Sequence, residues 1–228
     1  MHIPDGYLSP QTYVPLFGVS FLCWSVALKK LKRELSTKHI PYLAMADVFS
    51  FLIMMFNIPI PGGTTGHAVG AGIIAVLLGP WTAVIAVSVV IIIQALIFGD
   101  GGITAIGANC FNIAVLMPFV ASWVFRIIRG NSVSPSRLSF AAFLSGYISL
   151  TVSAIVVAFQ LGIQPLIAHD PTGRPLYAPY PLSIALPLMT LQHLLLFSFV
   201  EGIVTILLFR YFLKNEPGLV AAVSGKLR

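Results

Sequence analysis

Charged residues and cysteines are scarce in this sequence, and both shortages narrow what the protein can be. Only 9% of the 228 residues are Asp, Glu, Lys or Arg, whereas 57% are hydrophobic and the mean hydropathy is +0.94. An average soluble domain has roughly 25% charged residues. We therefore expect an integral membrane protein. The two cysteines, Cys23 and Cys110, both lie in apolar segments, which argues against a disulfide framework.

Familiar catalytic and nucleotide-binding motifs are also missing. The chain has no G-x-x-x-x-G-K-[ST] sequence, so it does not bind nucleotide phosphates through a P-loop. Glu201 does not stand in a His-Glu-x-x-His sequence, which removes the common zinc-protease arrangement. The internal repeats of many secondary transporters are not detectable either. These absences indicate a binding subunit rather than an enzyme or a complete pump.

Polar residues, glycines and prolines divide the chain into apolar segments, and a membrane-spanning helix needs roughly 20 such residues. The segments cover residues 11–28, 40–57, 67–79, 81–98, 108–125, 138–160 and 183–213. We therefore expect an all-α integral membrane protein with about seven transmembrane helices in one bundle. The third segment is short and rich in glycine, so it is expected to cross only part of the bilayer. One transmembrane domain over residues 1–214 and a short flexible cytoplasmic tail over 215–228 account for the chain.

The distribution of basic residues predicts the orientation. When the connections alternate between the two sides, twelve of the thirteen Lys and Arg residues fall on one side, and Arg174 is the exception. The positive-inside rule makes that side cytoplasmic, with the N-terminus outside and the C-terminus inside. The net charge of +6 then reflects topology. It suits contacts with anionic lipid or an acidic cytoplasmic partner, and it gives no indication of nucleic-acid binding.

The first two residues can chelate a metal ion. No basic or apolar leader precedes them, so we expect Met1 to be the mature end. The Met1 amine, the deprotonated His2 amide and the His2 imidazole close adjacent chelate rings and place their nitrogens in one plane. Planar nitrogen coordination suits Ni(II) or Cu(II), whereas Zn(II) prefers a tetrahedron. Copper is the chemical rival, because it binds most tightly in the Irving–Williams order.

A histidine on the same side can supply the fourth nitrogen. Connections 58–66, 99–107 and 161–182 share the outer side with the N-terminus, and the first is too rich in Pro and Gly to be helical. Such backbone is tolerated at membrane depth only against protein or a wet cavity. It leads directly into His67, which we expect to complete the site. The alternative is a histidine that only forms hydrogen bonds at a helix start.

Polar residues near this level are candidates for orienting the metal-binding groups. A metal-bound imidazole usually passes its other ring proton to a carboxylate, carbonyl or amide. The candidates are Asp5, Thr64, Thr65, Gln94 and Asn109, with Asp100 and Asn112 at a similar level. Asp5-Gly6 and Asp100-Gly101 are first interpreted as turns, because Asp-Gly is a common turn pair. Pro4 and the first of these turns would direct the N-terminal segment back into the bundle.

Three ionisable residues lie deeper in the apolar segments: Asp47, His193 and Glu201. Ionisable residues inside a membrane are functional candidates by default. Asp47 and Glu201 are both expected in the cytoplasmic half, where they could share a proton, meet a basic loop residue or contact a partner chain. A protonated, purely structural role is an equal alternative.

Four motifs together resemble one family. They are Met-His-Ile-Pro-Asp-Gly-Tyr-Leu-Ser-Pro at 1–10, Pro-Ile-Pro-Gly-Gly-Thr-Thr-Gly-His at 59–67, Gly-Pro-Trp at 79–81, and Gln-Ala-Leu-Ile-Phe-Gly-Asp-Gly-Gly at 94–102 running on to Gly-Ala-Asn at 107–109. Glu-Gly-Ile-Val-Thr at 201–205 also fits. Over residues 1 to about 214, the chain resembles the substrate-capturing membrane subunit of cobalt/nickel energy-coupling-factor (ECF) transporters, the CbiM/NikM type, found in prokaryotic plasma membranes.

The resemblance implies a seven-helix subunit that binds Ni(II) or Co(II) through the N-terminal amine, the amide and imidazole of the second residue, and the final His of the Gly-Gly-Thr-x-Gly-His motif. Here these are Met1, His2 and His67. The resemblance also implies a membrane scaffold subunit, two cytoplasmic ATPases and often a small accessory membrane protein in the same bilayer. The chain would then capture extracellular metal for ATP-driven uptake.

Two other functions stay open at this point. One is a stand-alone ion-coupled metal permease, in which Asp47, His193 and Glu201 form a proton relay. It predicts uptake by the isolated chain without ATP. The other is an assembly subunit whose N-terminus has no metal role, which predicts no stoichiometric Ni(II) or Co(II) after purification.

Overall fold

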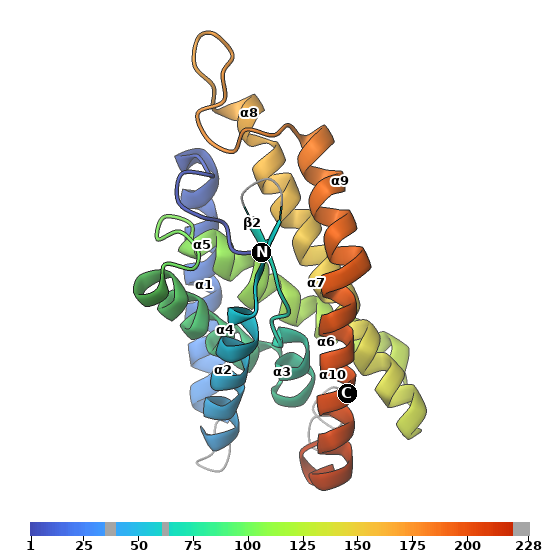
Figure 1. The fold of residues 1–228 in the computed structure, drawn as a ribbon. Helices are drawn as coiled ribbons and strands as arrows, with labels where there is room; N and C mark the ends of the chain where they lie inside the picture. Colours follow the sequence, from blue (N-terminus) through green and yellow to red (C-terminus); the bar gives the residue numbers. More distant parts are fainter. Residues whose placement is uncertain (35–39, 61–63, 221–228) are drawn as a thin grey trace.

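Long apolar helices lie side by side in this protein, whose computed structural model describes residues 1–34, 40–60 and 64–220 (Figure 1). The elements in chain order are α1 (Pro10–Glu34), α2 (Ile40–Met55), β1 (Ile58–Ile60), β2 (Thr64–Gly66), α3 (Ala71–Leu78), α4 (Pro80–Ile93), η2 (Gln94–Phe98), α5 (Ile106–Asn109), η3 (Cys110–Leu116), α6 (Met117–Arg129), α7 (Pro135–Gly162), α8 (Gln164–Ile167), α9 (Leu182–Gln192), η4 (His193–Phe197) and α10 (Ser198–Asn215). Within the described part, five helical stretches are long and apolar enough to cross a membrane. The expectation of a mostly helical membrane protein is confirmed.

The predicted count of seven spanning helices stays a prediction. α2 is apolar but only 16 residues long, and α3 has eight residues. A helix of eight residues is about 12 Å long, far short of a hydrocarbon core of about 30 Å. The third apolar segment is therefore a short helix preceded by a loop, as its glycine content suggested.

The connection after α2 is a pair of short strands, which the sequence analysis did not predict. β1 and β2 pair antiparallel, with Ile58 opposite Gly66 and Ile60 opposite Thr64. Pro59 excludes a helix here, and strand pairing satisfies backbone groups that would otherwise lie unpaired in an apolar environment. The hairpin brings the chain that enters His67 into the middle of the bundle.

π-helical turns interrupt three of the long helices. They are η2, η3 and η4, and they begin at Gln94, Cys110 and His193. Such turns are frequent at functional sites because the extra residue re-aims the side chains around it. Two of them begin at residues that the sequence analysis selected, and η3 follows directly after Asn109.

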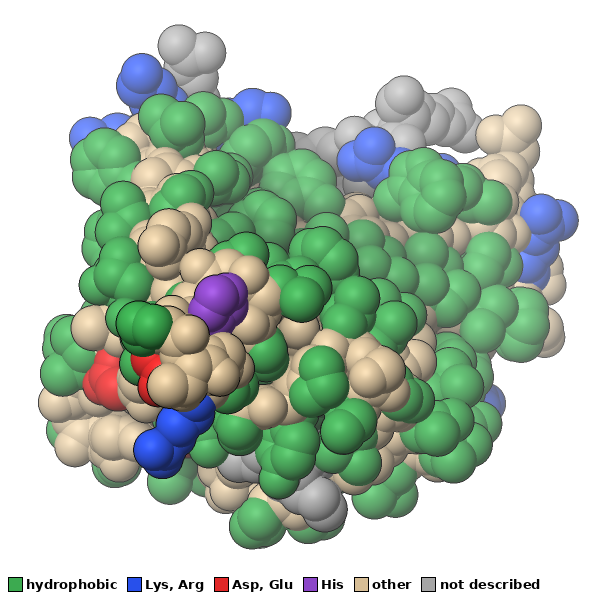
Figure 2. All heavy atoms as spheres, turned by 90° about the horizontal axis from the view of Figure 1, so that it is seen from above, with side chains coloured by type: hydrophobic (Ala, Val, Ile, Leu, Met, Phe, Trp, Pro, Cys, Tyr) green, Lys and Arg blue, Asp and Glu red, His purple; other side chains and the backbone are tan. Residues whose placement is uncertain are grey.

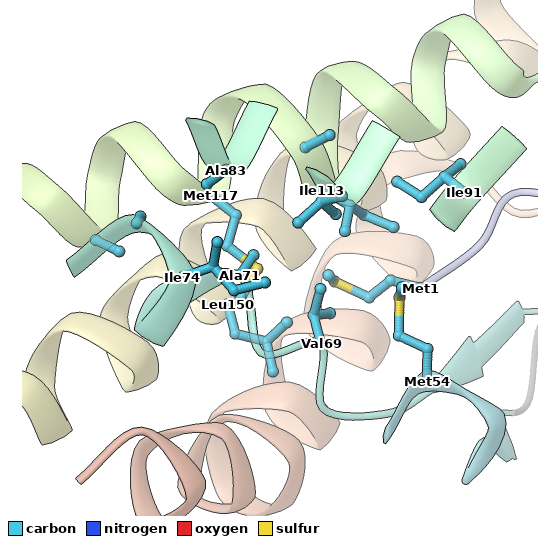
Figure 3. Close-up of a cluster of buried hydrophobic side chains, with 14 of the residues drawn as sticks. Met1, Met54, Val69, Ala71, Ile74, Ala83, Ile91, Ile113, Met117 and Leu150 are labelled. Atoms are coloured by element: carbon cyan, nitrogen blue, oxygen red, sulfur yellow. The ribbon is translucent and has the colours of Figure 1, made fainter. Parts of the chain in front are cut away.

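The N-terminal segment lies inside the bundle and not on its outer face. Figure 1 shows the N-terminus among the helices, and Figure 3 shows the Met1 side chain beside Met54 and Val69. The side chains of Met1, Met54 and Val69 are all fully buried. The predicted turn after Pro4 is present, with Gly6 at a φ of 79°. The inward course expected for this segment is thus observed.

Small residues allow α3, α7 and α10 to pack closely against one another. A Cβ at Gly72 would lie 3.1 Å from the Cα of Gly146, and a Cβ at Gly146 would lie 2.5 Å from Oγ1 of Thr205. Close approach through small residues is the usual way in which helices associate in membranes. The outside of the bundle is apolar instead: Figure 2, a view from above, shows mostly hydrophobic side chains with charged ones in small groups.

The basic residues gather at helix ends. Those with described side chains are Lys29, Lys30 and Lys32 at the end of α1, Arg126 and Arg129 at the end of α6, Arg137 at the start of α7, and Arg210 and Lys214 at the end of α10; Arg174 lies in the loop after α8. The orientation that this grouping suggested stays a prediction. In the expected tail, Val220 is buried, and residues 221–228 lie outside the described part of the chain.

Glu201 holds the start of α3. Its carboxylate accepts hydrogen bonds from the backbone N–H groups of Val69 (2.7 Å), Gly70 (3.0 and 3.1 Å) and Gly72 (3.4 Å). The first N–H groups of a helix have no partner within the helix, and here the side chain of α10 supplies one. Gly70, at a φ of 76°, makes the turn that brings these N–H groups together. This buried carboxylate therefore fixes the loop that follows His67.

Replacing Glu201 with Ala should destabilise the protein markedly. The substitution leaves three buried N–H groups without an acceptor, and we expect a loss of about 2–4 kcal/mol in the free energy of unfolding. Thermal unfolding of the purified chain in one detergent measures it, with Glu216→Ala, an exposed position, as the matched control. Equal melting temperatures for the two variants would contradict this role of the carboxylate.

Candidate metal site

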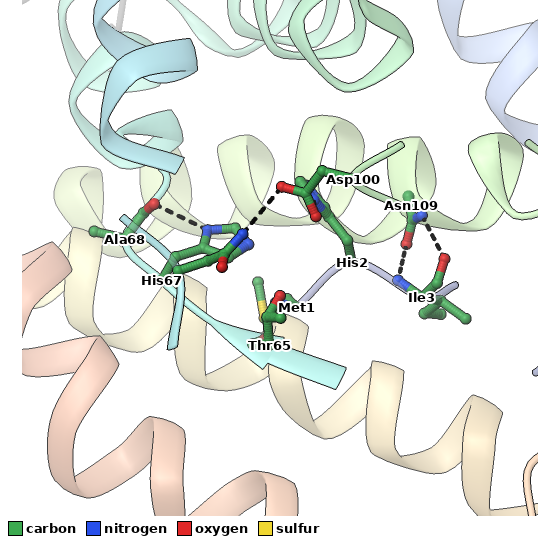
Figure 4. Close-up of polar contacts among 9 residues, drawn as sticks. Met1, His2, Ile3, Thr65, His67, Ala68, Asp100 and Asn109 are labelled. Carbon is green, nitrogen blue, oxygen red and sulfur yellow. Dashed lines mark hydrogen bonds and ion pairs between the residues drawn. The ribbon is translucent and has the colours of Figure 1, made fainter. Parts of the chain in front are cut away.

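The Met1 amine is the first nitrogen of the site. It donates a hydrogen bond to the carbonyl oxygen of Thr65, and Oγ1 of the same residue lies 3.4 Å away (Figure 4). The Met1 side chain packs into the core, so the amine is held at a defined depth. Thr65 belongs to strand β2, only two residues before His67. The chain end is therefore fixed next to the second part of the predicted site.

The imidazoles of His2 and His67 face each other. Their ring centroids are 4.9 Å apart, and only 3% and 1% of the two residues is exposed. Nδ1 of His67 lies 3.0 Å from the carbonyl oxygen of Ala68, which leaves Nε2 buried without a hydrogen-bond partner among the described residues. A ring with Nδ1–H on a carbonyl and a free Nε2 is the usual state of a metal-binding histidine. The structure thus brings together all three residues predicted to bind the metal.

Asp100 is the neighbour that the sequence analysis did not select. Its carboxylate lies 3.0 Å from Nδ1 of His2 and accepts a hydrogen bond of 3.2 Å from the Asn57 amide. The Asp-Gly pair is a turn, as expected, because Gly101 has a φ of 92°. The same turn also aims the carboxylate at the imidazole. The position of Asp100 among the polar residues expected on the outer side was the signal that could have identified it. The Asp-Gly pair was interpreted only as a turn.

Asn109 and Asp5 fasten the N-terminal segment. The Asn109 side chain accepts from the Ile3 N–H (2.8 Å) and donates to the Ile3 carbonyl (3.1 Å), as Figure 4 shows. Asp5 accepts from the N–H groups of Ile103 (3.0 Å) and Thr104 (2.9 Å) and from the Thr104 hydroxyl (2.6 Å). Both residues therefore hold backbone in place, and among the described residues neither forms a hydrogen bond with His2.

The other polar residues expected near the metal site differ in their hydrogen-bond partners. Thr65 contacts the amine, whereas the side chain of Thr64 lies outside the described part of the structure. Gln94 is fully buried, and neither polar atom of its side chain has a partner among the described residues. Asn112 is engaged elsewhere, because it exchanges two hydrogen bonds of 2.7 and 2.9 Å with Gln160.

His193 has the same hydrogen-bonding state as His67. It is fully buried, its Nδ1 lies 2.9 Å from the Met189 carbonyl, and its Nε2 has no partner among the described residues. Its ring lies 5.2 Å from that of Phe197, which packs so closely on Gly66 that a Cβ there would overlap it. η4 thus touches the strand that leads into His67.

Asp47 and Glu201 do not form a pair. Asp47 on α2 is partly exposed, and its Oδ1 has no hydrogen-bond partner among the described residues. Glu201 is bound to the backbone at the start of α3 instead. Within the described part of the chain, no hydrogen bond or ion pair joins Asp47, His193 and Glu201.

Burial keeps the nitrogen groups of Met1, His2 and His67 uncharged, so that each can donate a lone pair to a metal ion. It lowers the pKa of the Met1 amine to about 4, although Asp100 opposes this effect. Burial is also the main reason why the pKa of His67 lies well below its ordinary value, and the amine, His2 and His193 lower it further. The pKa of His2 is lowered by burial too, against the effect of Asp100. All three groups therefore present neutral lone pairs at pH 7, the form that binds metals.

The carboxylate beside them keeps its charge. Burial tends to raise the pKa of Asp100, but His2, the amine and Asn57 outweigh that effect and the pKa is lowered. Among the described residues, no group of three His, Cys, Asp or Glu side chains is arranged to hold a metal ion. A chelate at this position therefore has to use the amine and the backbone nitrogen of His2.

Known proteins resemble this sequence over most of its length. The family model of the cobalt uptake substrate-specific transmembrane region matches residues 2–219. The fused nickel transport protein NikMN of Rhodobacter capsulatus is 51% identical over 222 residues, which are 97% of this chain and 64% of that protein. The cobalt transport protein CbiM of Lachnoclostridium phytofermentans is 34% identical over 69% of this chain and 64% of its own length. The chain thus covers slightly less than two thirds of either relative.

Solved structures agree with these matches. The crystal structure of a truncated transition metal transporter has a TM-score of 0.90 to this chain, at 43% sequence identity, covering 94% of this chain and 99% of that one. The structural similarity therefore extends over nearly the whole chain. The chain belongs to the family of the cobalt uptake substrate-specific transmembrane region.

Proposed function

We propose that the chain captures Ni(II) or Co(II) from outside the cell as the substrate-binding membrane subunit of an ATP-driven uptake transporter of the energy-coupling-factor type. One observation carries the proposal. The Met1 amine, His2 and His67 converge in the bundle, and each is almost fully buried. Their four nitrogens, counting the His2 amide, are the donor set of a planar complex.

The chemistry of the donors favours nickel and accepts cobalt. A planar set of nitrogens suits Ni(II), and Co(II) can use the same donors, whereas Zn(II) prefers a tetrahedron. Copper would win on affinity alone. In support of nickel and cobalt as the transported ions, the relatives described above are nickel and cobalt transport proteins by name.

Capture requires the N-terminal segment to move. With both histidines at most 3% exposed, an ion reaches the site only when residues 1–8 leave their place or have yet to enter it. Asn109 on Ile3 and Asp5 on the loop after Gly102 are among the polar contacts that hold the segment in. On metal binding, Nδ1 of His2 turns from Asp100 to the ion, and the carboxylate stays nearby to balance its charge.

Release to the cytoplasm belongs to partner subunits in this proposal. The chain has no P-loop sequence. In this proposal, two cytoplasmic ATPases hydrolyse the ATP. They act through a membrane scaffold subunit and, in some systems, a small accessory membrane protein. The N-terminus lies outside and the C-terminus in the cytoplasm of a prokaryote, by the positive-inside rule. Residues 1–214 then form the metal-binding domain.

Inserting one Ala between Met1 and His2 tests the chelate. The longer end has an amine, two amides and an imidazole, so it binds metal by itself, whereas the native end needs His67. We expect the native chain to bind one Ni(II) and to lose at least about tenfold in affinity on His67→Ala. The inserted chain should bind equally well with or without His67, with a changed visible spectrum and no support of uptake.

Titration calorimetry and absorption spectra of the four chains measure these effects. His169→Ala is the matched control, because this histidine is exposed and should leave the affinity unchanged. Identical Ni(II) binding and spectra for the native and the Ala-inserted chains would mean that the N-terminus has no metal role. Absence of stoichiometric Ni(II), together with indifference to His67→Ala, would favour an assembly subunit.

Proton release provides an independent test. With the pKa of the Met1 amine at about 4 and those of His2 and His67 lowered, binding at pH 7 should release about one proton, from the His2 amide. The logarithm of the association constant should therefore fall by about one for each unit of decrease in pH, and more steeply below about pH 4. Calorimetry in buffers of different ionisation enthalpy counts the protons; a count near two means that the amine is protonated in the free protein.

A stand-alone permease makes the opposite prediction about transport. Because Asp47, His193 and Glu201 are not connected in the described residues, we expect the isolated chain in proteoliposomes to bind Ni(II) without translocating it, with or without a pH gradient. Asp47→Asn should leave binding unchanged. Uptake by the isolated chain that follows the pH gradient and is lost in Asp47→Asn would favour the permease.

A further inference from the structure

A groove lies between the beginning of α7 and the end of α10, far along the chain from the metal site. Its volume is about 980 Å³. The residues that line it are Pro135, Ser136, Ser139, Phe140, Ile206, Leu207, Arg210, Tyr211, Leu213, Lys214 and Asn215. Nothing in the proposed capture of metal uses this groove.

The lining changes in character along the groove. α7 and α10 are packed together, and α7 begins where α10 ends. Leu207 and Phe140 are apolar and more than half exposed, and they lie deeper in the spanning helices. Arg210 and Lys214 are nearer the end of α10, with Lys214 about 10 Å beyond Leu207 along the helix. The two cations therefore lie near the end of α10, whereas apolar lining residues run along the groove, including Tyr211 and Leu213 beside the cations in sequence.

The two cations have no counter-charge in the described structure. No described carboxylate forms an ion pair with Arg210 or Lys214, and none of the residues that line the groove is acidic. Ser136 and Ser139 add hydroxyl groups at the same end. By contrast, the pocket between α2, α3 and α10, at Phe49, Ile74 and Leu208, has no charged residue in its lining.

We propose that this groove binds an anionic phospholipid. The headgroup phosphate lies between Arg210 and Lys214 and accepts hydrogen bonds from Ser136 or Ser139, while an acyl chain follows Phe140 and Leu207. An acidic protein segment would match the cations but not the exposed apolar side chains of Phe140 and Leu207, which belong to helices long and apolar enough to cross a membrane. Basic sites at the membrane surface are attracted to anionic lipids in this way.

Native mass spectrometry of the purified full-length chain tests the proposal, with phosphatidylglycerol and phosphatidylcholine of identical acyl chains as probes. Two cations should give about a 30-fold preference for the anionic lipid. The preference should disappear in Arg210→Gln/Lys214→Gln. The matched control is Lys29→Gln/Lys32→Gln, which removes the same charge from exposed positions at the end of α1 and should keep the preference.

A second readout guards against variants that fold poorly. Phosphatidylglycerol should raise the melting temperature of the native chain by several degrees more than phosphatidylcholine does, and the Arg210/Lys214 variant should lose only this difference. Equal binding of the two lipids, or equal loss of preference in the Lys29/Lys32 control, would overturn the proposal. A third result would also overturn the proposal: no preference for either lipid, together with protection of the groove from chemical labelling only in a complex with a scaffold subunit.

Discussion

Placing a chain terminus inside an apolar bundle is the constraint on which the rest of this structure depends. An ammonium group loses its hydration there, and that loss holds the pKa of the Met1 amine at about 4. The neutral amine can donate to Thr65 and still offer a lone pair. Around it, Asn109 binds backbone at Ile3 and Glu201 binds backbone after His67, so each polar contact positions a nitrogen donor without competing for it.

The sequence predicted well what depends on local pattern. Hydrophobic runs located the long helices, and the structure places His67 beside the Met1-His2 end, the residues that coordination chemistry had selected as candidates. The contacts that orient these residues were harder to predict. Glu201 meets Gly70 across 131 positions of sequence, and hydropathy gives the depth of a carboxylate but not its partner. Asp100 was interpreted as a turn residue because an Asp-Gly turn has the same sequence whether or not its carboxylate also contacts an imidazole.

Helix α10 and the π-helical turn before it connect distant parts of the molecule. Phe197 packs on Gly66 just before His67, and Glu201 binds the loop just after it. His67 is thus held from both sides by one continuous helix, whose far end carries Arg210 of the groove. A displacement of this helix relative to α3 has to break the carboxylate bonds, and it would therefore be felt at the site.

The buried Met1 side chain has a consequence for biogenesis. Residues 1–8 are synthesised before the elements that enclose them, yet their pocket includes Met54, Thr65 and Asn109. Docking of the N-terminus is therefore a late step of folding in the membrane, after most of the bundle has been inserted. Any group on the amine nitrogen, whether a formyl group, an affinity tag or a preceding peptide, has to be removed in that interval. For the proposed capture of metal, deformylation or cleavage is then the step that frees the amine nitrogen for chelation.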